Sequence, residues 1–335
     1  MSQVRQTYFL IIGLLLSCIK LFAQDPNYSQ FFTSPLTISP ALAGNSDEKW
    51  RVMSTLRNQS IGIGANYNTR TIAVDGKIYN NPETLTYIGL GGLLMMEDAA
   101  DGAYKSNYMS INSSCHIALD QSDWIHGLTV GLGLIYNKTS INAADLSTGQ
   151  QLYSMGFNRT LPTADPTIKN LPGSVSICAG LAYTFTTDDM VVDLGVAGYR
   201  FYKTKQSVFN DASQFTSPRY NAHFYVNKLL KERLNLTVNG LYQIQNNVQG
   251  FTLGGHFGLS HSDNEELPRI LNIGAYYRVG DALIPYIGYV FNDFQFGITY
   301  DVQVSQQKTG SVTPKSLEIS LIYRHSRTSK NPLLW

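Results

Sequence analysis

Hydrophobic and polar residues alternate along much of this chain with a period of two. One face of the stretch 128–137 carries only apolar or aromatic residues, namely Leu128, Val130, Leu132, Leu134 and Tyr136. The same alternation runs through residues 271–278, 294–303 and 317–324. Successive side chains of a β-strand point to opposite faces, so the pattern predicts strands with one apolar and one polar face. Each run has about the 9 to 11 residues that a tilted strand needs to cross a bilayer.

Turn signals separate these runs, among them the stretches DAADG, TTDD, NKLLKER, HSDNEELP and QKTG. The runs number about fourteen, which is within the range of outer-membrane barrels. An open sheet edge in a bilayer would leave backbone groups unpaired, so lipid-facing strands require closure. We therefore expect an all-β protein, a closed antiparallel transmembrane β-barrel over residues 49–326, followed by a C-terminal tail over 327–335.

A soluble β-sandwich, in which two apolar faces pack against each other, is the alternative interpretation of the same alternation. The polar faces carry Gly, Asn, Thr, Ser and Gln more than the Lys and Glu of a solubilised surface, and Tyr recurs near the strand ends. Both features are typical of membrane barrels with aromatic girdles. Charged residues make up only 15% of the chain, against about 25% in soluble domains, which also favours the barrel.

The first residues have the layout of a secretory signal peptide. Arg5 precedes an apolar core over residues 8–16, and small residues follow as far as Ala23, so we expect a signal peptide over 1–23. Cleavage before Cys18, as in a lipoprotein, is the alternative. After the signal no apolar run reaches about 18 residues, so no transmembrane helix is expected. Export and lipid-facing strands together indicate the outer membrane.

The segment over residues 24–48 lacks a regular period and is rich in proline and aromatic residues. Proline has no N–H, so this segment cannot join a strand ladder, yet its aromatic rings need burial. A barrel of about fourteen strands has a lumen wide enough to need filling. The segment is either a partial plug of the lumen or an arm that docks on a periplasmic partner, and the sequence leaves both open. The candidate contact residues are Tyr28, Phe31, Phe32, Pro35 and Pro40.

Charged residues within the predicted strands belong to the polar faces. A charge on the lipid face costs about 2 to 4 kcal/mol at mid-bilayer, so these side chains should point into the lumen. They are Arg51, Arg57, Asp193, Arg278, Asp301, Glu318 and Arg324. They form either a network that braces the wall or a selectivity lining, and their mixed signs favour bracing.

Candidate chemistry is sparse. The histidines are scattered without metal-ligand spacing, no G-x-S-x-G motif occurs, and EDAADG lacks the ligand series of a calcium loop. Cys115 and Cys178 lie in predicted strands, so a disulfide framework is not expected. The net charge of +1 gives no basis for nucleic-acid binding. We therefore expect no catalytic residues, no metal, no cofactor and no enzymatic activity.

Several stretches in a fixed order resemble one known family. They are QDPNYSQFFTSPLTISPALAG, RVMSTLRNQ, MEDAADGAYKSNYMSINSSCHIAL, NIGAYYRVGDALIPYIGYVFNDFQFGITYDV and SLEISLIYR. Together they resemble the PorP/SprF family of type IX secretion system membrane proteins, over nearly the whole chain after the signal. Each stretch is weak alone, and their ordered combination makes the resemblance specific.

The resemblance implies a non-enzymatic outer-membrane protein that acts in secretion or surface anchoring of a partner, such as a gliding adhesin. It implies binding to the C-terminal domain of that secreted protein, together with contacts to other type IX components and to outer-membrane lipid. A passive outer-membrane pore or a transporter of hydrophobic solutes would use the same barrel and is the alternative.

Overall fold

The computed structural model describes thirteen stretches of the chain. They are residues 27–59, 61, 67–99, 102–121, 125–142, 151–153, 156–158, 173–201, 204–205, 215–246, 248–261, 268–305 and 315–327. The predicted signal peptide over 1–23 and residues 328–335 of the predicted tail lie outside the described residues.

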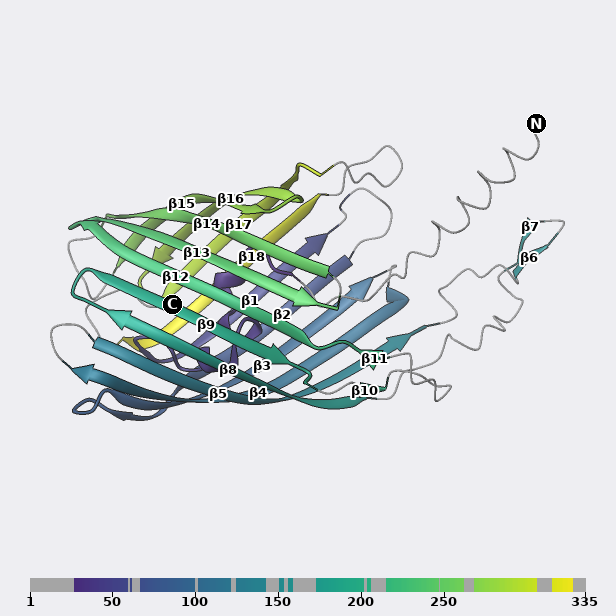
Figure 1. Cartoon of the computed structure of the whole chain (residues 1–335). Helices are drawn as coiled ribbons and strands as arrows, with labels where there is room; N and C mark the ends of the chain where they lie inside the picture. Colours follow the sequence, from purple (N-terminus) through teal and green to yellow (C-terminus); the bar gives the residue numbers. More distant parts are fainter. Residues whose placement is uncertain are drawn as a thin grey trace, which may run out of the picture.

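Fourteen antiparallel strands form a closed barrel, as the alternation predicts (Figure 1). The strands are β1 (Glu48–Gln59), β2 (Tyr67–Asn81), β3 (Thr86–Ala99), β4 (Tyr104–Gln121), β5 (Ile125–Ile141), β8 (Ser174–Thr186), β9 (Met190–Tyr199), β12 (Arg219–Lys231), β13 (Leu234–Gln245), β14 (Val248–Ser260), β15 (Arg269–Arg278), β16 (Ala282–Phe291), β17 (Phe294–Gln303) and β18 (Ser316–Arg327). Each barrel strand pairs with the barrel strands that precede and follow it in this list, and β1 pairs with β18 to close the ring.

Two short hairpins lie outside the barrel ladder. They are β6 (Leu152–Tyr153) with β7 (Gly156–Phe157), and β10 (Thr204–Lys205) with β11 (Phe215–Thr216). Within the described part of the chain, no helix is long and apolar enough to cross a membrane.

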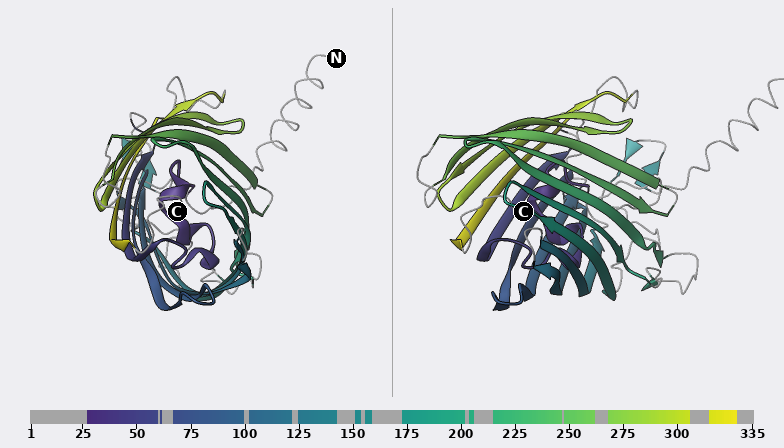
Figure 2. Two further views of the ribbon diagram at one scale, coloured as in Figure 1. Left: turned by 90° about the vertical axis from the view of Figure 1, so that its left-hand side faces the viewer. Right: turned by 60° about the vertical axis from the view of Figure 1, so that its left-hand side comes forward.

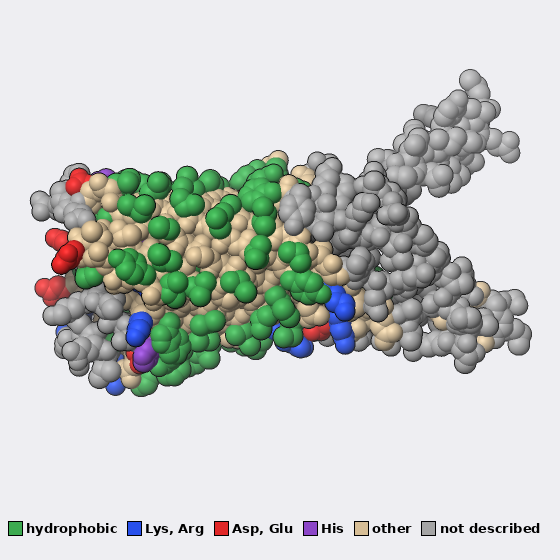
Figure 3. All heavy atoms as spheres, turned by 90° about the horizontal axis from the view of Figure 1, so that it is seen from below, with side chains coloured by type: hydrophobic (Ala, Val, Ile, Leu, Met, Phe, Trp, Pro, Cys, Tyr) green, Lys and Arg blue, Asp and Glu red, His purple; other side chains and the backbone are tan. Residues whose placement is uncertain are grey.

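The outer face of the barrel is apolar because the strands alternate in burial. In β16 the burial changes strictly from one residue to the next, with the odd-numbered residues on the outside. Leu132 is 63% exposed and Ile298 is 44% exposed, so both lie on the outer face. Figure 3 shows hydrophobic side chains spread over the face in view, with charged side chains gathered toward the two ends. This distribution is typical of a barrel surrounded by lipid.

The two ends of the barrel differ in their connections. Gln59, Gln303 and the starts of β2 and β14 lie at one end, where the connections include residues 142–173 and 200–218. We call it the long-loop end. The opposite end carries Glu48 and Arg327 and turns such as 232–233 and 292–293, and we call it the short-turn end.

Residues 27–47, which we call the luminal segment, lie inside the barrel (Figure 2). They form three short 3-10 turns, η1 (Phe31–Thr33), η2 (Pro35–Thr37) and η3 (Pro40–Leu42). Pro35 and Pro40 each occupy the start of a turn, where a missing N–H costs no hydrogen bond. The segment starts at the long-loop end and reaches β1 at the short-turn end, and the hydrophobic core lies between it and the inner wall.

Candidate functional site

The first residues of the luminal segment are held by the carboxylate of Glu318 on β18. Its two oxygens accept the backbone N–H groups of Ser29 and Gln30, each at 2.8 Å. The Gln30 side chain also donates to the Glu318 carbonyl at 3.0 Å and accepts from Ser320 at 2.7 Å. Hydrogen bonds to an ionised acceptor are stronger than neutral ones, so the segment is firmly attached to this strand.

An ion-pair network surrounds this attachment. Arg57 on β1 contacts Glu318 at 2.9 Å and Asp301 at 3.1 Å, and Arg278 on β15 contacts Asp301 at 3.1 Å. The Ser29 hydroxyl donates to Asp301 at 2.6 Å and accepts from both Arg57 and Arg278. We call Ser29, Arg57, Arg278, Asp301 and Glu318 the anchor network. Buried charges need such pairing because each loses its hydration.

The two phenylalanines of the segment, Phe31 and Phe32, lie in an aromatic cluster on the inner wall. Phe32 stacks on Tyr276 of β15, with ring centroids 5.0 Å apart, and meets Tyr286 of β16 edge-on at 5.2 Å. Phe31 is 1% exposed and lies edge-on to Tyr276. The Tyr28 hydroxyl is hydrogen-bonded to Thr71. Aromatic pairs in these geometries contribute about 0.5 to 1.5 kcal/mol beyond their burial.

The middle of the segment presents its carbonyl groups to the wall. Tyr199 donates to the carbonyl of Leu36 at 3.2 Å, and Asn221 donates to that of Ile38 at 2.8 Å. Arg219 donates to the carbonyl of Thr37 at 3.1 Å. A backbone outside regular structure needs partners when it is buried, and wall side chains supply them here.

Glycines on the wall strands allow the segment to lie directly on the wall. A Cβ atom at Gly131 of β5 would be 2.2 Å from the amide nitrogen of Ala41. A Cβ atom at Gly89 of β3 would be 2.0 Å from the Ala43 carbonyl oxygen. Glycine inside a strand commonly marks a close backbone approach. These strand glycines are therefore a sequence signal for the path of the segment, and the alternation alone does not reveal it.

The last residues of the segment bind a second group of charges. Asp75 on β2 accepts the backbone N–H of Gly44 at 2.6 Å and pairs with Arg51 at 2.8 Å. Asn45 donates to Asp193 of β9 at 3.0 Å. Asp75 is not among the lumen charges predicted from the sequence, although the alternation places it on an inner face, directly opposite Arg51 on the neighbouring strand.

The structure divides the sequence-predicted lumen charges between the two ends. Arg57, Arg278, Asp301 and Glu318 come together in the anchor network. Arg51 lies with Asp75, and Arg324 pairs with Glu48 at 3.0 Å. Pro35 and Pro40 are buried in the segment.

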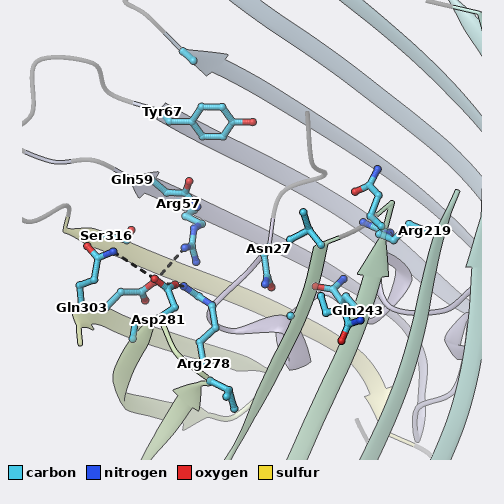
Figure 4. Close-up of a pocket in the computed structure, with 18 of the residues that line it drawn as sticks. Asn27, Arg57, Gln59, Tyr67, Arg219, Gln243, Arg278, Asp281, Gln303 and Ser316 are labelled. Carbon is cyan, nitrogen blue, oxygen red and sulfur yellow. Dashed lines mark hydrogen bonds and ion pairs between the residues drawn. The ribbon is translucent and has the colours of Figure 1, made fainter. Parts of the chain in front are cut away.

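A pocket of about 680 Å³ opens at the long-loop end, above the anchor network (Figure 4). We call it the mouth pocket. Its wall includes Asn27, Arg57, Gln59, Tyr67, Ala99, Tyr104, Arg219, Gln243, Gln245, Val248, Gln249, Gly250, Arg278, Val279, Asp281, Ala282, Asp301, Gln303 and Ser316. Among the residues that the structure describes, no group of His, Cys, Asp and Glu is arranged to hold a metal ion.

A family model described as type IX secretion system membrane protein PorP/SprF matches residues 20–323. Two solved structures share the barrel fold. The Ralstonia pickettii toluene transporter TbuX aligns with a TM-score of 0.50 at 10% identity, over 88% of this chain and 94% of its own. A Pseudomonas aeruginosa FadL homologue aligns with a TM-score of 0.50 at 11% identity, over 84% and 90%. A search of curated proteins gives no match.

Proposed function

The chain belongs to the PorP/SprF family of type IX secretion system membrane proteins and is an outer-membrane β-barrel, and from this premise we propose a non-enzymatic role in secretion or surface anchoring of a partner protein. The proposed partner is a secreted surface protein, such as a gliding adhesin, which is bound through its C-terminal domain. Other type IX components would attach to the same barrel.

The observation that carries this proposal is the occupied lumen. Residues 28–46 are almost all buried inside the barrel, and their contacts reach β2, β9, β12, β15 and β18. A barrel filled by its own chain is suited to present its two rims to other proteins rather than to pass a solute. In outer-membrane barrels the short turns are periplasmic and the longer loops extracellular, so the long-loop end would face the partner.

We assign the luminal segment the role of a partial plug. Support comes from its burial, from the anchor network at its start and from the Asp75 carboxylate at its end. An arm that docks on a periplasmic partner would instead need its aromatic rings exposed, whereas Phe31 packs on Tyr276.

Transport of hydrophobic solutes is the second candidate, because the toluene transporter TbuX shares the barrel fold. The lumen of this chain argues against it. An apolar solute that entered at the long-loop end would have to pass the buried ion pairs of Arg57 and Arg278, and it would replace none of their hydrogen bonds.

The test is a deletion of this protein in its native host, with surface proteins identified by protease shaving and mass spectrometry. We expect one large secreted partner to disappear from the surface while bulk type IX export continues. A pull-down of the tagged protein in mild detergent should recover the same partner, and re-expression of the wild-type protein should restore its display. A defect in every exported protein would indicate a core secretion role instead, and no defect would favour a passive pore.

A further inference from the structure

A group of charged side chains lies on the outer face of the barrel, close to the long-loop end. We call it the basic patch, and it consists of Arg70 on β2, Asp98 on β3, Lys105 on β4 and Lys138 on β5. The three basic side chains are exposed, whereas the adjacent residues Thr71, Ser106 and Thr139 are buried, which places the basic side chains on the outer face. Figure 3 shows basic and acidic side chains at this end of the face in view, where the hydrophobic side chains stop.

Strand register places the two lysines of the patch next to each other. Lys105 lies opposite Ser140, and Lys138 lies opposite Asn107, so the lysines are diagonal neighbours on adjacent strands. Diagonal neighbours in an antiparallel pair are about 7 to 8 Å apart. Two long and flexible ammonium side chains at this spacing can contact the same anionic group.

The charges of the basic patch do not cancel. Arg70 pairs with Asp98 at 3.3 Å, whereas neither lysine forms an ion pair with another residue in the described part of the chain. Three basic side chains and one carboxylate therefore leave an excess of two positive charges, which attracts anions. The exposed charges of the short-turn end have both signs, for example Arg269 and Asp293, so they produce no such excess.

Exposed apolar side chains continue from the basic patch toward the middle of the barrel. On the same four strands the register aligns Ile72, Leu94, Met109 and Tyr136 side by side, and all four are exposed. A free anion, or the acidic surface of a soluble protein, would contact only the basic side chains. A lipid would contact both, the basic side chains with its headgroup and the apolar row with its acyl chains. The combination therefore favours an anionic lipid.

We propose that the basic patch binds a phosphate group of lipopolysaccharide, the phosphorylated glycolipid of the outer leaflet, with Lys105 and Lys138 as its main contacts. The longer loops of outer-membrane barrels face the cell exterior, so the patch lies at the level of the outer-leaflet headgroups. A lysine ammonium group binds phosphate as a point charge, and basic side chains beside an anionic lipid surface strengthen attachment to it. The inference concerns a lipid and not the secreted partner, and it shares with the proposed function only the orientation of the barrel.

The test is native mass spectrometry of the full-length protein, refolded without lipid in micelles of an amine oxide detergent, which carries no phosphate. Diphosphoryl lipid A and phosphatidylglycerol are added in equal amounts. We expect lipid A to bind in preference, because it carries more phosphate charge. The double variant Lys105→Gln/Lys138→Gln should bind lipid A at least about tenfold more weakly, as expected for the loss of two basic groups beside a lipid headgroup. Lys105→Arg/Lys138→Arg, which keeps both charges, should stay within about twofold of the wild type.

Lys228→Gln/Arg269→Gln is the matched control, because it removes two exposed positive charges at the short-turn end. That end lies farther from the basic patch than the Debye length of about 10 Å, so the affinity should stay within about twofold. Heat-modifiability gels check that each variant is folded. Absence of lipid A binding, equal binding by Lys105→Gln/Lys138→Gln and wild type, preference for phosphatidylglycerol, or displacement of lipid A by an equal concentration of inorganic phosphate would overturn the proposal.

Discussion

Glu318 and Arg57 illustrate how single residues couple the luminal segment to the wall. The Glu318 carboxylate is buried, and two backbone N–H groups of the segment take the place of water around it. Arg57 forms ion pairs with both Glu318 and Asp301, so one guanidinium group neutralises part of the charge of two carboxylates. The start of the segment therefore depends on the network, because Glu318 and Asp301 accept its hydrogen bonds, whereas the ion pairs themselves join wall residues only.

Replacement of Arg57 by Gln should lower the free energy of unfolding by about 3 to 5 kcal/mol, since Asp301 and Glu318 lose a common buried partner. The measurement is urea-induced unfolding in lipid vesicles. Arg70→Gln is the control, because Arg70 is 59% exposed in its pair with Asp98 and should cost at most about 1 kcal/mol. Equal losses in the two variants would show that the anchor network does not stabilise the fold.

At the scale of elements, the wall and the luminal segment are built by different rules. The wall is a ladder of neighbouring strands that closes through β1 and β18, and it contains no residue before Glu48. The segment has only short 3-10 turns and relies on side chains and glycines of the wall. Closure of the barrel therefore does not require the segment, whereas the position of the segment requires the barrel.

Deletion of residues 25–44 should leave a barrel that still inserts, because the ladder is intact. We expect the truncated protein to gain ion conductance in planar bilayers and to lose thermal stability, since burial of its aromatic side chains is worth about 1.5 to 3 kcal/mol each. Simultaneous replacement of Tyr28, Phe31 and Phe32 by Ala should reproduce most of the effect. Unchanged conductance together with loss of periplasmic proteins from a pull-down would indicate a docking arm instead of a plug.

The whole molecule is a barrel with an apolar outer face and two rims that differ in their connections. Its outer face carries many exposed large hydrophobic residues, while the charged residues of the anchor network lie inside. Near the short-turn end Trp50 stacks on His325 and meets Tyr323 edge-on. Aromatic side chains at this level are typical of a membrane interface, so the bilayer should cover the barrel wall between the two rims.

Leu132→Arg should destabilise the inserted barrel by about 2 to 4 kcal/mol, because Leu132 lies on the outer face midway along β5. Leu230→Arg is the matched control, because Leu230 is beside the turn at 232–233 and should cost at most about 1 kcal/mol. Unfolding in vesicles measures both. A larger loss for Leu230→Arg would place the middle of the bilayer near the short-turn end.

The sequence by itself determined the wall of the barrel. Alternation with period two is a local property, and it assigns each strand residue to the inside or the outside once the strand is recognised. In the structure Leu132 and Ile298 are exposed on the outer face, and Arg57 and Glu318 are buried. The strand number and the closure follow as well, because turn signals separate the runs and a bilayer tolerates no open edge.

Only the tertiary structure decided what lies inside that wall. Gln30 and Ser320 are hydrogen-bonded although 290 positions separate them in the chain, and no local pattern encodes such a contact. Which inward charges meet depends on strand register, and the pairing of Asp75 with Arg51 becomes evident only once β1 and β2 are aligned. The luminal segment has no period of its own, so its path became visible only when the closed barrel brought distant glycines, carboxylates and aromatic rings around it.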